Sequence, residues 1–162
     1  ELRLSTDGGP SQTISARVPA GVNDGAKIRV KGKGSMGDAG PGDLFILLHV
    51  KAHQIFSRKG ENIAITVPVT FAEAALGADI KVPTLSGDDV TVRLAPGTPN
   101  GRVLRVKGRG ITKGSTTGDL LVTVEVQVPQ RVEGKAAEAL RTFEKETESI
   151  DVRSEFISKA SI

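Results

Sequence analysis

Two short segments combine cations with glycines, the residue types that can hold a phosphate group. "IRVKGKG" covers Ile28 to Gly34, and "LRVKGRG" covers Leu104 to Gly110. The first copy runs on to Gly37 and formally matches G-x-G-x-x-G, but a dinucleotide site also needs a helix that starts there. The following "DAGPGD" cannot form a helix, and the second copy breaks the glycine spacing. The pattern argues against a dinucleotide site, and the chain has no P-loop motif.

The same cations could instead contact nucleic acid, yet the net charge is only +3, from 22 basic and 19 acidic residues. The chain has five Phe and no Trp or Tyr, and no aromatic lies among the cations to stack on bases. In an alternating strand Arg29 and Lys31 face one side, while Ile28 and Val30 face the other. We favour a solvent-exposed strand face, with Gly32 and Gly34 supplying positive φ for a bend. Nucleic-acid binding by the repeated Arg/Lys strands is the alternative.

The remaining polar residues do not form a catalytic or metal-binding group. Asp43 and Asp119 occupy equivalent positions of the two copies, so we expect each to cap its own turn rather than act as an acid–base pair. His49 and His53 lie at a strand end with no third ligand nearby, which argues against a metal site. We predict that the chain is not an enzyme.

The two basic segments belong to a longer internal repeat. Val18–Val50 aligns with Leu94–Val126 at a constant offset of 76, without a gap. Among the matching residues are Gly21 with Gly97 and Arg29 with Arg105. This many coincidences at one offset indicate a duplicated structural unit.

Each unit has the pattern of β structure. "TISARVP" and "VTVRLAP" alternate, and "GDLFILLHV" and "GDLLVTVEV" predict the longest strand of each unit. Before its copy, the second unit has the strand 62–71, and "FAEAALG" then predicts a short helix that Gly77 ends. The first unit has no counterpart of this part, so we expect the sequence to be a fragment of a longer protein.

The pattern of apolar residues changes from that of strands to that of a helix after Pro129. Ala136, Ala139, Leu140 and Phe143 have helical spacing, which predicts one amphipathic helix over 133–149 followed by a tail. A lone helix with a narrow apolar stripe is marginal by itself, so it docks on its own second unit or on another chain.

The composition bounds the cellular setting. The chain has no cysteine, which excludes disulfides and thiolate metal sites and fits a reducing compartment. No apolar run is long enough to span a bilayer, and the N-terminus lacks a signal-peptide pattern. We expect a cytoplasmic protein with no membrane partner.

Several motifs together resemble the C-terminal substrate-binding and dimerisation region of bacterial DnaJ-type heat-shock co-chaperones. These are "PAGV.DG..IR..G.G", "GDL", "H.IF.R.G", "V....AALG" and "VPTL.G", with "PGT..G...R..G.G" and "GDL" in the second copy. The likeness covers nearly all of residues 1–129.

The resemblance implies a mostly β fold. Two tandem, similar β-sandwich subdomains with a short helix would be followed by the C-terminal amphipathic helix. The implied divisions are residues 1–54, the truncated peptide-binding subdomain; 55–129, the second subdomain; and 130–162, the dimerisation helix and tail.

The resemblance also implies a function. Such a co-chaperone holds unfolded or misfolded polypeptides in a hydrophobic groove, prevents their aggregation, delivers them to a DnaK-type chaperone, and forms a V-shaped homodimer through its C-terminus. The groove would be lined by Leu2 and Leu4 in "LRLS" and by Phe56 in "H.IF", with Ile28, Val30 and Ile46 as further candidates. The dimer interface would use Leu140, Phe143, Phe156 and Ile157.

The sequence departs from many members of that family in two respects. It has no J-domain, so we do not expect it to stimulate a partner's ATPase by that route. Many relatives insert a cysteine-rich, two-zinc module where Asp7–Gln12 here bridges directly to the next strand. Either the chain belongs to a branch without zinc, or the module was excised and the full-length protein binds zinc. We expect no cofactor in these 162 residues.

Overall fold

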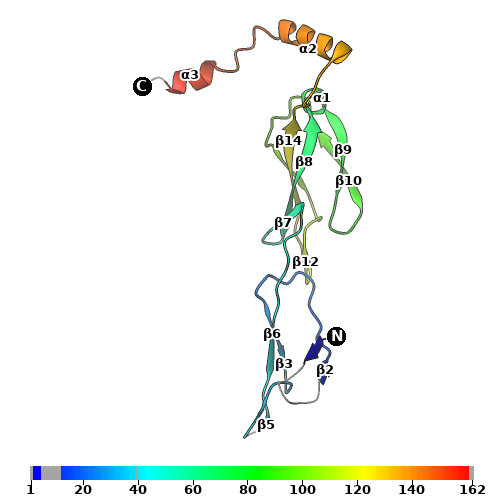
Figure 1. Ribbon diagram of the computed structural model, residues 1–162, viewed down its shortest axis with the longest axis vertical. Helices are drawn as coiled ribbons and strands as arrows, with labels where there is room; N and C mark the ends of the chain where they lie inside the picture. The colour runs from blue at the N-terminus through cyan, green and yellow to red at the C-terminus, as the bar shows by residue number, and fades with distance from the viewer. Residues whose placement is uncertain (1, 5–11, 39, 161–162) are drawn as a thin grey trace. The chain divides into compact units, whose positions relative to one another are not determined.

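The computed structural model describes residues 2–4, 12–38 and 40–160, with the backbone alone at 2–4 and 12. The chain forms two compact units (Figure 1). The first, Glu1–Val126, contains both copies of the internal repeat, here called the first and second repeats, and the second is Gln127–Ile162. Asp7 to Ser11, the first part of the bridge where relatives carry a zinc module, lie outside the described residues. The predicted division of the first unit after residue 54 stays a prediction.

The fold is mostly β, as the sequence predicts. The elements are β1 (Leu2–Leu4), β2 (Gln12–Ile14), β3 (Lys27–Val30), β4 (Met36–Gly37), β5 (Gly40–Pro41), β6 (Leu44–Leu47), β7 (Phe56–Lys59), β8 (Asn62–Thr70), α1 (Phe71–Leu76), β9 (Ala78–Pro83), β10 (Asp89–Leu94), β11 (Val103–Val106), β12 (Thr112–Lys113), β13 (Thr116–Thr117), β14 (Leu120–Gln127), α2 (Gly134–Glu146) and α3 (Ser154–Ala160).

The internal repeat is visible in the strands and in their hydrogen bonds. β3, β4, β5 and β6 of the first repeat correspond to β11, β12, β13 and β14 of the second. In each repeat the first and last of these strands pair antiparallel, as β3–β6 and as β11–β14. The loop bond from the Gly34 amide to the Gly42 carbonyl, 2.8 Å, recurs at 2.8 Å between Gly110 and Gly118.

The two glycines of the basic segment have different roles. Gly32 has φ +65° and its counterpart Gly108 has φ +68°, as expected for a bend that needs glycine. The prediction for Gly34 was wrong, because it does not adopt positive φ. A β carbon at Gly34 would lie 2.5 Å from the Asp43 carbonyl oxygen. Gly34 is therefore required by close backbone approach and not by a left-handed conformation.

The main hydrophobic core lies in the second repeat. A four-stranded sheet of order β11-β14-β8-β7 packs with the β9–β10 hairpin and α1. Strict alternation along these strands sends every second residue inward, which is why the two layers share one core. The buried apolar residues of this core are Ile63, Ile65, Val69, Ala74, Ile80, Val82, Val92, Leu94, Leu120, Val122 and Val124. Among the described side chains of the first repeat, Ile14 is the one buried apolar residue.

Helix α1 is present and ends before Gly77, as the sequence predicts, and a capping box that was not predicted fixes its start. Thr70 and Glu73 form a capping box: the Glu73 amide donates to Thr70 Oγ1 at 3.2 Å, and the Thr70 amide donates to Glu73 Oε2 at 2.8 Å. Gly77 follows the last turn with φ +83°, and its amide donates to the Glu73 carbonyl. These bonds fix where β8 ends and where β9 can start.

The second unit contains α2 and α3. The expected amphipathic helix over 133–149 is present as α2, whereas α3 within the predicted tail was not expected. Neither helix has a fully buried residue. Among the described residues, no helix has the length and apolarity needed to cross a membrane.

Candidate functional site

A half-buried apolar row lies on one face of the β3–β6 sheet. Ile28 pairs with Ile46 and Val30 pairs with Leu44 in the antiparallel register, so these side chains lie on the same face. All four are partly buried, while their strand neighbours are exposed. Three of the six residues predicted to line a peptide groove, Ile28, Val30 and Ile46, are therefore brought together.

Leu2 and Leu4 lie on β1, which pairs with β2. The register places Leu2 opposite Ile14 and Leu4 opposite Gln12. The side chains of Leu2 and Leu4 lie outside the described part of the chain, so their role in a groove stays a prediction.

Phe56 lies apart from the apolar row. It belongs to β7, one of the two edge strands of the second repeat's sheet, where it is paired with Ile65. Its side chain packs against the main core and contacts the His53 ring, with centroids 5.0 Å apart. The structure thus gives Phe56 a packing role in the second repeat and does not join it to Ile28, Val30 and Ile46.

The opposite face of β3–β6 is exposed and partly apolar. Phe45, 61% exposed, is opposite Arg29, and Leu47 is opposite Lys27. Phe45 was not among the site residues predicted from the sequence. The run "LFILL" contained the signal, since an uninterrupted apolar run in a strand puts apolar residues on both faces.

The backbone of β3 offers hydrogen-bonding groups at its outer edge. The Leu48 amide donates to the Ala26 carbonyl at 2.8 Å, so the register makes Ala26, Ile28 and Val30 the residues whose backbone groups face β6. The backbone groups of Lys27 and Arg29 are then directed away from β6. An extended peptide could pair with this edge as an added strand.

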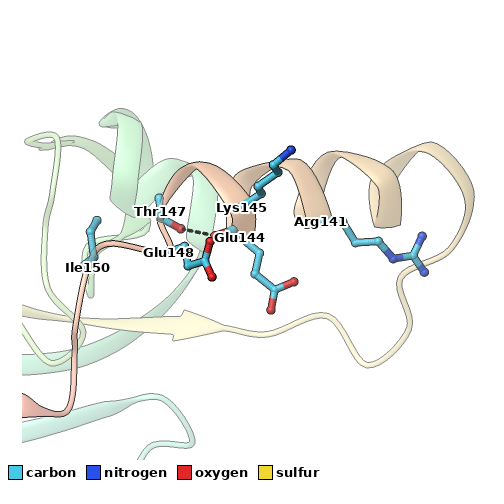
Figure 2. A pocket seen from close by; sticks show the side chains of 6 residues that line it. All are labelled: Arg141, Glu144, Lys145, Thr147, Glu148 and Ile150. Atoms are coloured by element: carbon cyan, nitrogen blue, oxygen red, sulfur yellow. Dashed lines mark hydrogen bonds between the residues drawn. The ribbon is translucent and has the colours of Figure 1, made fainter.

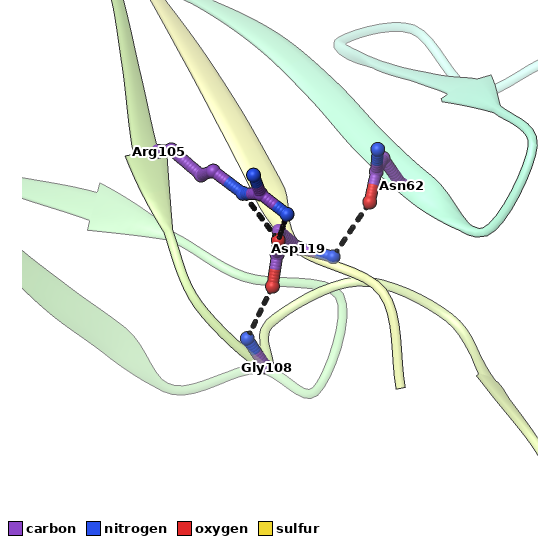
Figure 3. Close-up of polar contacts among 4 residues, drawn as sticks. All are labelled: Asn62, Arg105, Gly108 and Asp119. Atoms are coloured by element: carbon purple, nitrogen blue, oxygen red, sulfur yellow. Dashed lines mark hydrogen bonds and ion pairs between the residues drawn. The ribbon is translucent and has the colours of Figure 1, made fainter. Parts of the chain in front are cut away.

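Each repeat carries an Arg–Asp–Gly network that fixes the basic bend. In the second repeat the Gly108 amide donates to Asp119 Oδ1 at 2.8 Å, and Arg105 forms an ion pair with Oδ2 (Figure 3). The Asp119 amide in turn donates to Asn62 Oδ1 at 2.8 Å, which links β8 to this network. In the first repeat Asp43 binds the Gly32 amide and Arg29 in the same way.

The networks correct the role predicted for the two aspartates. Each caps the Lys-Gly bend of its repeat, 11 residues earlier, and not the turn in which it lies. The Gly108 amide, followed by the Arg105 guanidinium, holds the pKa of Asp119 below its ordinary value of 3.8. The Gly32 amide and Arg29 lower the pKa of Asp43 in the same way. These carboxylates are structural anions.

The same networks weaken the nucleic-acid interpretation. Arg29 and Arg105 are each bound by a carboxylate of their own repeat, so two of the repeated cations are already neutralised. Salt-dependent binding to nucleic acid requires several cations that can replace counterions on phosphates. Of the two repeated segments, the exposed Lys31, Lys33, Lys107 and Arg109 remain for such contacts, without an interleaved aromatic.

The two histidines have different partners: His53 binds backbone amides, and His49 lies near a carboxylate. His53 Nδ1 accepts the amides of Ile55 at 3.2 Å and Phe56 at 3.3 Å. His49 Nδ1 lies 3.8 Å from Asp24 Oδ1, which also accepts the Val50 amide at 2.8 Å. Among the described residues, no three His, Cys, Asp or Glu side chains are grouped so that they could hold a metal ion.

A comparison with protein families identifies the architecture. The model of the DnaJ C terminal domain matches residues 3–129. The chain belongs to the DnaJ C-terminal domain family. The matched range spans from β1 to the residues just after β14, and therefore includes both repeats.

Curated relatives of this DnaJ-family chain are chaperones by name. It is 54% identical over 153 residues to Chaperone protein DnaJ 1 of Streptomyces avermitilis, covering 93% of this chain and 39% of that protein. It is 51% identical to Chaperone protein DnaJ 1 of Streptomyces coelicolor, with 93% and 38% covered. It is 53% identical to Chaperone protein DnaJ 2 of Corynebacterium efficiens, with 82% and 34% covered. The chain thus spans well under half the length of these relatives.

The second unit of this DnaJ-family chain lies mostly beyond the family match. Leu140 and Phe143 are three residues apart on α2, and Phe156 and Ile157 are adjacent on α3. All four predicted dimer residues are exposed within the chain. An exposed apolar stripe on a helix is typical of a surface that meets another chain.

The end of α2 borders a pocket of about 500 Å³ that carries charges of both signs. It is lined by Arg141, Glu144, Lys145, Thr147, Glu148 and Ile150 (Figure 2). Thr147 Oγ1 donates to the carbonyls of Phe143 at 2.8 Å and Glu144 at 3.4 Å, which caps the last turn of the helix. Of the lining side chains, Thr147 therefore stabilises the helix end.

Proposed function

We propose that this chain binds unfolded or misfolded polypeptide segments in extended form on its first repeat, prevents their aggregation and delivers them to a DnaK-type chaperone in the cytoplasm. The observation that carries the proposal is the apolar row of Ile28, Val30, Leu44 and Ile46 beside a strand edge whose backbone groups point outward. Membership of the DnaJ C-terminal domain family supports the same function.

Strand addition explains how such a site could accept many different clients. Backbone hydrogen bonds to Lys27 and Arg29 would be independent of the client's sequence, while the apolar row would favour segments with alternating apolar side chains. Unfolded polypeptides expose both features, whereas folded proteins hide them.

We expect Leu4→Asp to weaken binding of an extended apolar peptide by about tenfold or more, because a charge in the proposed groove opposes apolar contact with the peptide. Fluorescence anisotropy with a labelled unfolded peptide would measure the affinity. Leu76→Asp is the matched control, since Leu76 is an exposed leucine at the end of α1. Equal affinities of the two variants, with intact far-ultraviolet circular dichroism, would exclude Leu4 from the site. Phe56→Ser is a poorer test because Phe56 packs on the main core.

We further propose that the chain forms a homodimer through Leu140, Phe143, Phe156 and Ile157. Burying these side chains between two copies would remove apolar surface from water, which is the main driving force of association. If the full-length protein contains a cysteine-rich module, its zinc would be held there, because the present chain has no cysteine.

Removal of all residues after Pro129 should convert the dimer to a monomer, because the proposed interface lies entirely on α2 and α3. Multi-angle light scattering would report the mass. Leu140→Asp should also weaken the dimer, whereas Lys135→Asp on the same helix should not. A truncated protein that keeps the mass of a dimer would show that the interface lies elsewhere.

A further inference from the structure

We propose that Arg58 is a positioning residue that locks the first repeat to the second. The proposal concerns the sequence motif "H.IF.R.G", whose Arg is not used by the peptide site or by the dimer surface. It rests on contacts between the repeats and stands whether or not the first repeat binds peptides.

The guanidinium of Arg58 donates hydrogen bonds to three backbone carbonyls. It lies on β7, and its Nε donates to the Gly60 carbonyl at 2.7 Å, within the same turn. Its Nη1 donates to the Val22 carbonyl at 2.7 Å, and its Nη2 donates to the Gly21 carbonyl at 2.9 Å. The side chain is half-buried, and no ion pair involves it among the described residues.

The geometry suits arginine in particular. A guanidinium presents five N–H donors in a rigid planar fork, so one edge can meet two successive carbonyls while Nε meets a third. Hydrogen bonds from a charged donor are also stronger than those between neutral groups. Arg58 therefore ties the "PAGV" turn of the first repeat to the β7–β8 turn of the second.

A second contact between the repeats lies beside the hydrogen bonds of Arg58 to Gly21 and Val22. Gly21 has φ +75° and faces the loop that leads into β12. A β carbon at Gly21 would lie 2.9 Å from Ile111 Cγ2 and 3.1 Å from the Thr112 carbonyl oxygen. The turn thus approaches the second repeat so closely that only glycine fits without a shift.

The second copy of the turn shows that this contact is specific to the first. Gly97, the equivalent of Gly21, has φ +76°, but a β carbon there would meet nothing within 4 Å. Its amide donates to the Ala75 carbonyl of α1 at 3.1 Å, and the Thr98 amide donates to the Ala74 carbonyl at 3.0 Å. The two copies of the turn therefore have different partners. The copy in the second repeat binds α1, and the copy in the first repeat binds Arg58.

The consequence is a fixed orientation between the two repeats. Two packed bodies that share few contacts normally rotate about their connection. Two hydrogen bonds from Arg58 to the Gly21 and Val22 carbonyls, together with one close backbone approach, oppose that rotation here. Arg58 would thereby set the direction in which the apolar row of the first repeat faces relative to the second repeat.

The test is a distance distribution between spin labels, one on each repeat. Because the chain has no cysteine, Met36→Cys and Asp88→Cys create two unique and exposed labelling sites. Double electron–electron resonance on the doubly labelled chain should give a narrow distribution of distances between the two labels. Arg58→Ala should make it at least about twofold wider, as expected for released rigid-body motion.

Gly21→Ala and Gly97→Ala form the matched pair, because they introduce the same strain at nearly the same φ. Gly21→Ala should shift or widen the distribution, whereas Gly97→Ala should leave it unchanged. A distribution in Arg58→Ala as narrow as in the parent chain would overturn the proposal. If Arg58→Ala does not fold, the glycine pair decides, and equal effects of the two would also overturn it. No peptide is used, so the outcome is independent of the proposed binding function.

Discussion

Gly118→Ala is expected to lower the free energy of unfolding by about 3 kcal/mol, because overpacking a closed site forces the backbone to move. A β carbon at Gly118 would collide with the backbone carbonyl of Glu61, and the Asn62 amide nitrogen would lie 3.0 Å away. These are main-chain atoms that cannot rotate aside. The Glu61 carbonyl also accepts the Ile111 amide at 2.8 Å, so moving it breaks a second contact.

Gly42→Ala is the matched control for this prediction. Gly42 occupies the equivalent position of the first repeat, but a β carbon there would come no closer than 3.4 Å to the Ser35 carbonyl oxygen. We expect a loss of about 1 kcal/mol or less, which is usual away from closed sites. Urea unfolding followed by circular dichroism would give both values. Losses of equal size would mean that the approach of Glu61 to Gly118 does not constrain the fold.

This pair illustrates what the sequence could and could not predict about the fold. The repeat, the alternating strands and the short helix α1 with its stop at Gly77 follow from sequence patterns, and the structure confirms them. Gly42 and Gly118 occupy equivalent positions of the aligned copies, yet the Glu61 backbone closely approaches Gly118 alone of the two. The difference depends on a contact between residues far apart in the chain, which no local pattern encodes.

The candidate site divides in the same way. Strand alternation correctly placed Ile28 and Val30 on one face of β3, and the register brings Ile46, a candidate from the family resemblance, beside Ile28. Phe56 was grouped with them through a motif, but its register opposite Ile65 directs it into the second repeat's core. Helix α3 was missed because its seven residues form too short a window for helical periodicity to be read.

The polar networks were the least predictable part of the molecule. Arg105 and Asp119 are 14 residues apart, and the sequence offered only their recurrence in the first copy. A carboxylate that binds both an amide and a guanidinium is identified only when the chain folds back on itself. The basic segments resembled a ligand site because Asp43 and Asp119, the carboxylates that bind their arginines, lie outside these segments in the sequence.

Asp119→Ala should destabilise the protein more than Asp43→Ala does. Both variants lose a hydrogen bond to the bend amide and an ion pair to arginine. The Asp119 side chain is 12% exposed against 21% for Asp43, so water replaces the lost partners less well. The backbone of Asp119 is also held by Asn62, so the second network reaches the core strand β8. Urea unfolding at neutral pH should show the larger loss for Asp119→Ala, and the reverse order would contradict the assignment.

The pH dependence separates the charge of Asp119 from its hydrogen bond. Its pKa is lowered in the folded protein, so its contribution to stability is complete above the ordinary value of 3.8 and is lost as the pH falls through the folded pKa. Asp119→Asn keeps an oxygen that can accept the Gly108 amide but removes the titrating charge. Between about pH 5 and pH 2, unfolding of this variant should therefore depend less steeply on pH than that of the parent chain. Identical slopes would show that Asp119 titrates in the folded chain as it does in the unfolded one. In that case the bond to Gly108 and the ion pair to Arg105 would not stabilise the charged form of Asp119 in solution.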